Sequence, residues 1–127
     1  MEKQITTGLK NTFLIHFLLG AIFGLIYLLI PEVWGNLINW DIPEPAAYRL
    51  VGAAVLAFGV SSWLAYKDGV WVHVRLLTQL EIIWTILATF VMLWGMIFEG
   101  LPAFGWVSTV IFAAFALAFS VMYTKQS

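Results

Sequence analysis

The chain carries one carboxyl group and one imidazole inside long apolar segments, where ionisable side chains are rare and usually functional or paired. Glu81 and His16 lie at similar depth, roughly 5–9 Å inside their segments at about 1.5 Å of helix rise per residue. We therefore expect them to contact each other. Such a pair can titrate a proton, bind a cation or anchor the polar head of a small ligand. Alternatively it is structural, either as a bonded pair or as a protonated Glu81 bonded to serine or threonine.

Hydroxyl side chains lie at the same depth. Thr78 and Thr85 recur with Glu81 at spacings of three or four residues, so they share one helix face. That face is expected to turn inwards, because a hydroxyl or carboxyl group facing lipid would have no hydrogen-bond partner. The candidate polar site therefore comprises Glu81, His16, Ser61, Ser62, Thr78 and Thr85.

Arg49 is the second unusual polar residue. It opens an apolar segment, where the positive end of the helix dipole disfavours a cation. Its expected partners are the acidic residues of the neighbouring loops, Asp41, Glu44 and Glu99. We predict an ion pair that pins the outer loop, with an anion or lipid-headgroup site at the outer surface as the alternative.

Four apolar segments must position these groups. With 62% hydrophobic and 10% charged residues, the chain differs from an ordinary soluble domain. Its balanced charge excludes a nucleic-acid partner, and its lack of cysteine excludes thiolate metal sites. We predict one all-α domain over residues 1–127, an antiparallel bundle of four transmembrane helices. The spans are about 12–30, 47–66, 75–98 and 104–123.

The basic residues indicate the orientation. If successive helices cross the membrane in opposite directions, five of the six Lys and Arg residues lie on the same side of it: Lys3, Lys10, Lys67, Arg75 and Lys125. The positive-inside rule then predicts a multi-pass protein of the cell (cytoplasmic) membrane with both termini in the cytoplasm. On the outer side, residues 31–45 form the one sizeable loop, whose apolar residues at helical spacing predict a short interfacial helix.

Gly20 and Gly24 form a pair of small residues at four-residue spacing. Such pairs let helix backbones approach closely in a membrane. The pair predicts packing within the chain, or a contact with a second copy or another membrane subunit. Membrane lipid is the remaining expected partner.

The function predicted from these residues is non-enzymatic. The sequence has no paired carboxylates, no nucleophile–base pair and no glycine-rich phosphate loop. An accessory or assembly subunit, or a bundle that binds lipid or a small ligand, is the first hypothesis. The first alternative is an oligomeric transporter or channel that uses Glu81 and His16. The second is a subunit that binds haem or chlorophyll through His16, with His73 too shallow to complete a pair of axial ligands. No cofactor is expected under the first hypothesis.

Three short motifs carry a family resemblance: Pro31-Glu32-Val33-Trp34, Arg49-Leu50-Val51-Gly52-Ala53-Ala54 and Trp63-Leu64-Ala65-Tyr66-Lys67. With these motifs the chain resembles an abundant group of small four-helix prokaryotic membrane proteins of unknown function, and it is also similar to DoxX-like proteins. The resemblance implies the four-helix membrane fold and brings no assigned activity.

Overall fold

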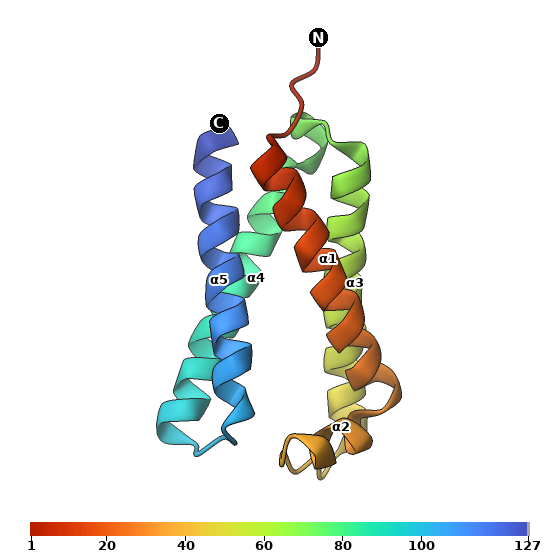
Figure 1. Cartoon of the computed structure of the whole chain (residues 1–127), viewed down its shortest axis with the longest axis vertical. Coiled ribbons are helices and arrows are strands. Elements are labelled where there is room, and N and C mark those ends of the chain that lie inside the picture. The colour runs from red at the N-terminus through yellow and green to blue at the C-terminus, as the bar shows by residue number, and fades with distance from the viewer. Residues whose placement is uncertain (127) are drawn as a thin grey trace.

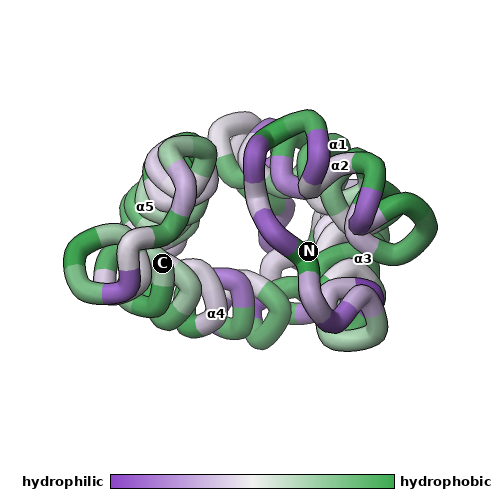
Figure 2. The backbone as a smooth tube through the Cα atoms, turned by 90° about the horizontal axis from the view of Figure 1, so that it is seen from below, coloured by the Kyte–Doolittle hydropathy of each residue, from purple (hydrophilic) through white to green (hydrophobic). Residues whose placement is uncertain are grey.

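The computed structural model describes residues 1–126, which form five helices. These are α1 (Thr7–Leu29), α2 (Pro31–Leu37), α3 (Pro45–Asp68), α4 (Trp71–Phe98) and α5 (Phe104–Gln126). All but α2 are long and apolar enough to cross a membrane. Figure 2 looks along the helices and shows hydrophobic residues on their outer sides, where large side chains such as Ile22 and Leu87 are exposed. The predicted all-helical bundle of four spans is confirmed.

The helices extend beyond the apolar segments because capping residues and turn glycines, and not hydropathy, determine where they begin and end. Thr6 caps α1, its Oγ1 accepting a hydrogen bond from the backbone N–H of Leu9 at 3.2 Å. At the other boundary, α3 continues to Asp68 and ends at Gly69, whose φ of 71° is the left-handed conformation that favours glycine. A span predicted from hydropathy alone is therefore shorter than the helix that contains it.

The short helix predicted within residues 31–45 is present as α2, at the start of that loop. Pro31 occupies its first turn, and only Ile30 separates it from α1. A proline fits the first helical position because the missing N–H would have no intrahelical acceptor there. Pro31 therefore ends one helix and begins the next.

The four long helices form two pairs. Figure 1 shows α1 beside α3 and α4 beside α5, with the pairs meeting at the end that carries both termini and diverging towards α2. Contacts within each pair are far more extensive than contacts between pairs. We call the two ends of the bundle the termini end and the α2 end.

Glycines create the close seam between α1 and α3. A Cβ atom added to Gly20 would lie 2.9 Å from the Cα of Gly59, and one added to Gly24 would lie 2.7 Å from the backbone nitrogen of Leu56. Real side chains do not approach backbone atoms so closely, so these positions require glycine. The small-residue pair identified in the sequence thus packs within the chain.

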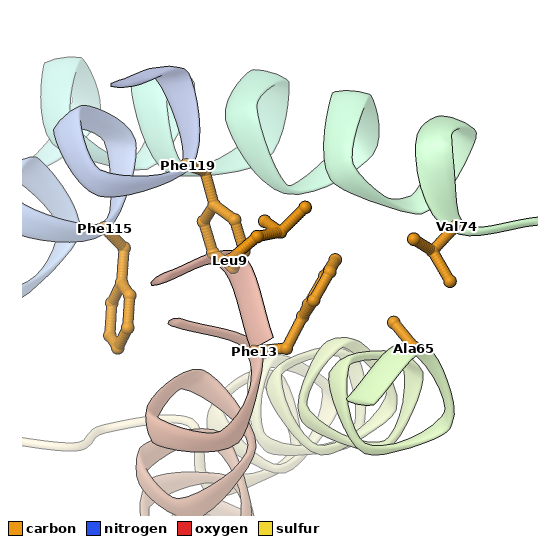
Figure 3. Close-up of a cluster of buried hydrophobic side chains, with 6 residues drawn as sticks. All are labelled: Leu9, Phe13, Ala65, Val74, Phe115 and Phe119. Carbon is orange, nitrogen blue, oxygen red and sulfur yellow. The ribbon is translucent and has the colours of Figure 1, made fainter. Parts of the chain in front are cut away.

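An apolar cluster joins the two pairs at the termini end. Figure 3 shows its side chains converging from α1, α3, α4 and α5. Phe13 packs against Phe119 with ring centroids 5.3 Å apart, and both side chains are fully buried. The cluster comprises Leu9, Phe13, Ala65, Val74, Phe115 and Phe119.

The segment before α1 makes hydrogen bonds at the same end, which we call the clasp; it comprises residues 3–6 with Gly69 and Gln126. The backbone N–H of Ile5 donates to the carbonyl of Gly69 at 2.9 Å, in the turn between α3 and α4. The side chain of Gln126, which is 1% exposed, accepts from the N–H of Thr6 at 2.7 Å and donates to the carbonyl of Gln4 at 3.2 Å. The N-terminal segment therefore ties the α3–α4 turn to the end of α5.

Candidate functional site

Glu81 lies fully buried in the layer where the two helix pairs meet. Its Oε1 accepts hydrogen bonds from Ser61 at 2.9 Å and from Ser62 at 3.3 Å. Its Oε2 lies 3.4 Å from the Nε2 of His16. The predicted contact between Glu81 and His16 is present, and it links α1, α3 and α4 at one point. We call Glu81, His16, Ser61, Ser62 and Trp84 the polar cluster.

The proton positions in the polar cluster depend on the tautomer of His16. If Ser62 donates to Glu81, the Nδ1 of His16 is the donor towards Ser62. If Ser62 donates instead to Nδ1, 2.7 Å away, His16 presents an Nε2–H towards Glu81. In both arrangements Ser62 bridges His16 on α1 and Glu81 on α4.

Trp84 is a member of the cluster that the sequence analysis did not select. Its indole N–H donates to the Oε2 of Glu81 at 3.0 Å, and its ring stacks on Phe58 with centroids 4.7 Å apart. Two sequence signals point to it in retrospect. Trp84 follows Glu81 by three residues, on the same helix face, and it lies too deep for the aromatic residues of a membrane interface.

Thr78 and Thr85 share the buried face of α4 as predicted, but neither hydroxyl reaches the carboxyl group. Thr78 donates to the backbone carbonyl of Val74 at 2.9 Å, and Thr85 donates to the backbone carbonyl of Glu81 at 2.6 Å. Both are therefore satisfied within their own helix. Their contribution to the site is to let α4 turn this face inwards without an unpaired hydroxyl.

A cavity of about 210 Å³ lies between the helix pairs, on the α2 side of the polar cluster. His16 and Trp84 line its inner end, which we call the floor. Apolar side chains of all four long helices form its wall, among them Leu19, Val55, Met92 and Phe112. For scale, a closed cavity of about 150 Å³ lined by apolar side chains holds a benzene molecule. This one has the volume and the character of a site for a small apolar group.

Hydroxyl groups line the opposite end of the cavity, which we call the rim. Tyr27 and Tyr48 stack there with ring centroids 6.4 Å apart, and Ser108 and Trp40 also line the cavity. Trp34 donates from its indole nitrogen to the Tyr27 hydroxyl at 3.3 Å. Within residues 1–126, no hydrogen bond involves the hydroxyl of Tyr48 or of Ser108. This end could not be predicted from the sequence, because residue depth does not show which way a helix faces.

The prediction for Arg49 named the wrong partners. Its guanidinium lies 3.8 Å from a carboxylate oxygen of Glu32, and not beside Asp41, Glu44 or Glu99. The reason is the pairing of the helices. Glu32 stands in the first turn of α2, directly after α1, which runs beside α3, whereas Glu99 ends α4 in the other pair. Both Arg49 and Glu32 are largely exposed.

We expect Arg49→Ala to lower the free energy of unfolding by less than about 1 kcal/mol, because an exposed ion pair gains little over hydrated charges. Glu32→Gln serves as the matched variant, and the double variant completes a cycle that isolates the pair. The measurement is unfolding in mixed detergent. A loss above roughly 2 kcal/mol for Arg49→Ala alone would mean that this arginine has a further, stabilising contact.

The two histidines differ in their surroundings. Both ring nitrogens of His16 face protein groups, Ser62 and Glu81. His73 is half exposed at the start of α4, where its Nδ1 lies 2.9 Å from the carboxylate of Asp68. No three His, Asp or Glu side chains in the described part of the chain are grouped so that they could hold a metal ion. Axial ligation of haem or chlorophyll through His16 would require the polar cluster to break.

Comparisons with protein-family models, with curated proteins and with solved structures gave no match to this chain.

Proposed function

We propose that this protein is a non-enzymatic membrane bundle that binds a small, mainly apolar molecule from the bilayer, in the cavity between its two helix pairs. We place it in the cell membrane with both termini in the cytoplasm, following the distribution of Lys and Arg. We also assign it to the group of small four-helix membrane proteins that its short motifs resemble.

The observation that carries this proposal is the cavity itself. It lies between the helix pairs, all four long helices line it, and it has an apolar wall with polar groups only at its two ends. Ligand sites in proteins usually combine a concave apolar wall with a few polar groups that set orientation. The two helix pairs diverge towards α2 (Figure 1), and the lining residues come from both pairs.

The polar cluster favours binding over transport. Every buried side-chain polar atom in residues 1–126 has a hydrogen-bond partner, so the cluster offers no vacant position for an ion. On its other side, the apolar cluster around Phe13 and Phe119 separates it from the termini end. In that direction Thr78, whose hydroxyl donates to the carbonyl of Val74, is the next polar side chain on the buried face of α4, and the residues of the cluster beyond it are apolar. We therefore interpret the polar cluster as the structural floor of the binding site.

Filling the cavity provides the test. We expect Val55→Phe, which places a larger side chain on the cavity wall, to remove a small molecule that the wild-type protein retains when extracted from its native membrane. Native mass spectrometry in mild detergent detects the retained molecule as added mass. The helical far-UV spectrum should not change.

Val60→Phe is the matched control, because Val60 lies on the same helix, is 42% exposed and does not line the cavity. It should keep the bound molecule. The proposal fails if the wild type carries no added mass from any native membrane, or if Val60→Phe releases the molecule as fully as Val55→Phe does.

A further inference from the structure

The vacant hydrogen-bonding capacity of the cavity lies at its rim and not at its floor. At the floor, both nitrogens of His16 and the indole N–H of Trp84 already have protein partners. At the rim, the hydroxyl of Ser108 has no partner within residues 1–126, although a serine in a helix commonly donates to a carbonyl of the preceding turn. The Tyr48 hydroxyl is equally unpaired in the described chain, and both residues are partly exposed. The accessible hydroxyl groups that a ligand could bond therefore lie at the rim.

The lining also determines the charge of the ligand. No Lys, Arg, Asp or Glu side chain of residues 1–126 lines the cavity. A charged group placed there would lose its hydration without gaining a counter-charge, which is costly in an apolar site. Hydroxyl groups, in contrast, both donate to a carbonyl and accept from another hydroxyl. The rim thus suits an alcohol or a carbonyl compound.

The shape of the cavity limits the rest of the molecule. His16 and Tyr27 stand at opposite ends of the cavity, roughly 16 Å apart along α1 at about 1.5 Å per residue. An elongated molecule of about this length can therefore reach from the rim to the floor. The aromatic rings of Trp84, Phe112 and Phe115 surround the far end of such a molecule.

We propose that Ser108 and Tyr48 form a subsite for the hydroxyl or carbonyl group of an uncharged, elongated amphiphile, whose apolar part extends towards His16 and Trp84. This inference rests on the proposed function and adds the class of the ligand and its direction in the site. The direction is opposite to the one expected from the sequence, in which Glu81 and His16 would anchor the polar head.

The test uses dodecan-1-ol with a photoreactive diazirine at the end of its chain, applied to the full-length protein in lipid nanodiscs. Wild-type protein should be labelled saturably, and labelled peptides should come from the Trp84 and Phe112–Phe115 regions near the floor. Unlabelled dodecan-1-ol should compete about three- to tenfold more strongly than dodecane, the ratio that one hydrogen bond of roughly 1 kcal/mol provides. In Ser108→Ala/Tyr48→Phe this preference should disappear while competition by dodecane remains.

The matched control, Ser120→Ala/Tyr66→Phe, removes the same two hydroxyl groups from the same two helices, outside the cavity. It should behave as the wild type. Equal competition by the alcohol and the alkane in wild-type protein would overturn the subsite and leave the cavity as a binding site. Label at Tyr48 or Ser108 would overturn the direction. Absence of saturable labelling altogether would overturn the proposed function as well, so the two failures are distinguishable.

Discussion

Replacing Glu81 by leucine is expected to destabilise the bundle by about 3–5 kcal/mol, the range for removing one partner of a buried charged or proton-sharing pair. The leucine would fill a similar volume, so packing changes little. It would leave the indole N–H of Trp84 and the Nε2 of His16 without a partner. It would also remove the carboxylate oxygen that accepts hydrogen bonds from Ser61 and Ser62. Titration with sodium dodecyl sulfate, followed by tryptophan fluorescence, measures the loss.

Glu81→Gln is the informative counterpart and should cost less than about 1 kcal/mol. The glutamine carbonyl can accept from Trp84 and from His16 in its Nε2–H form. Its amide group can donate to the two serine hydroxyls, and Ser62 then donates to the Nδ1 of His16. Every partner remains satisfied without a charge. A large loss in Glu81→Gln would show that a negative charge on Glu81 is needed, and would contradict the structural interpretation of the polar cluster.

Gly52→Ala should lower the free energy of unfolding by about 1–3 kcal/mol, the usual cost of overpacking. Helix propensity alone predicts the opposite sign, a gain of about 1 kcal/mol for alanine over glycine inside a helix. The cost of overpacking should exceed the gain in helix propensity, because a Cβ at Gly52 would lie 2.7 Å from the carbonyl carbon of Tyr27 and 2.8 Å from the carbonyl oxygen of Gly24. Those are atoms of α1 that cannot rotate away. The same detergent titration gives the sign directly.

Gly8→Ala provides the comparison within the same protein. The Cβ there would meet only the flexible side chain of Met122, at 2.6 Å from its sulfur atom. A methionine can change its rotamer, so this substitution should be neutral or stabilising. If Gly52→Ala and Gly8→Ala changed stability equally, the tight seam between α1 and α3 would not be a source of stability.

The sequence predicted well what depends on position along a helix. Four apolar segments determined the spans, and counting residues from their ends placed Glu81, His16 and Ser62 at one depth, where the structure brings them into contact. A carboxyl group in an apolar segment has few available partners, so depth alone was almost sufficient. The same counting could not assign Trp84, whose aromatic ring is equally compatible with lipid.

What the sequence could not predict depends on rotation and pairing. Apart from the polar face of α4, the long helices are apolar around most of their circumference, so their periodicity does not show which face meets which neighbour. The partner of Arg49 was therefore wrong, since identifying Glu32 requires knowing that α1 lies beside α3. The cavity is lined by residues of all four long helices, so predicting it requires the arrangement of the two pairs, which local sequence patterns do not give.

The clasp at the termini end also constrains how the chain is assembled during synthesis. Thr6 and Lys3 find partners in Gln126, more than a hundred residues later in the chain. The α1–α3 seam, in contrast, needs only the first half of the protein. The hairpin of α1 and α3 can therefore pack in the membrane during synthesis, before Gln126, the hydrogen-bond acceptor for the N-terminal segment, has been made. The last turn of α5 completes that acceptor, so the bonds of the N-terminal segment to Gln126 can form only after Gln126 has been synthesised.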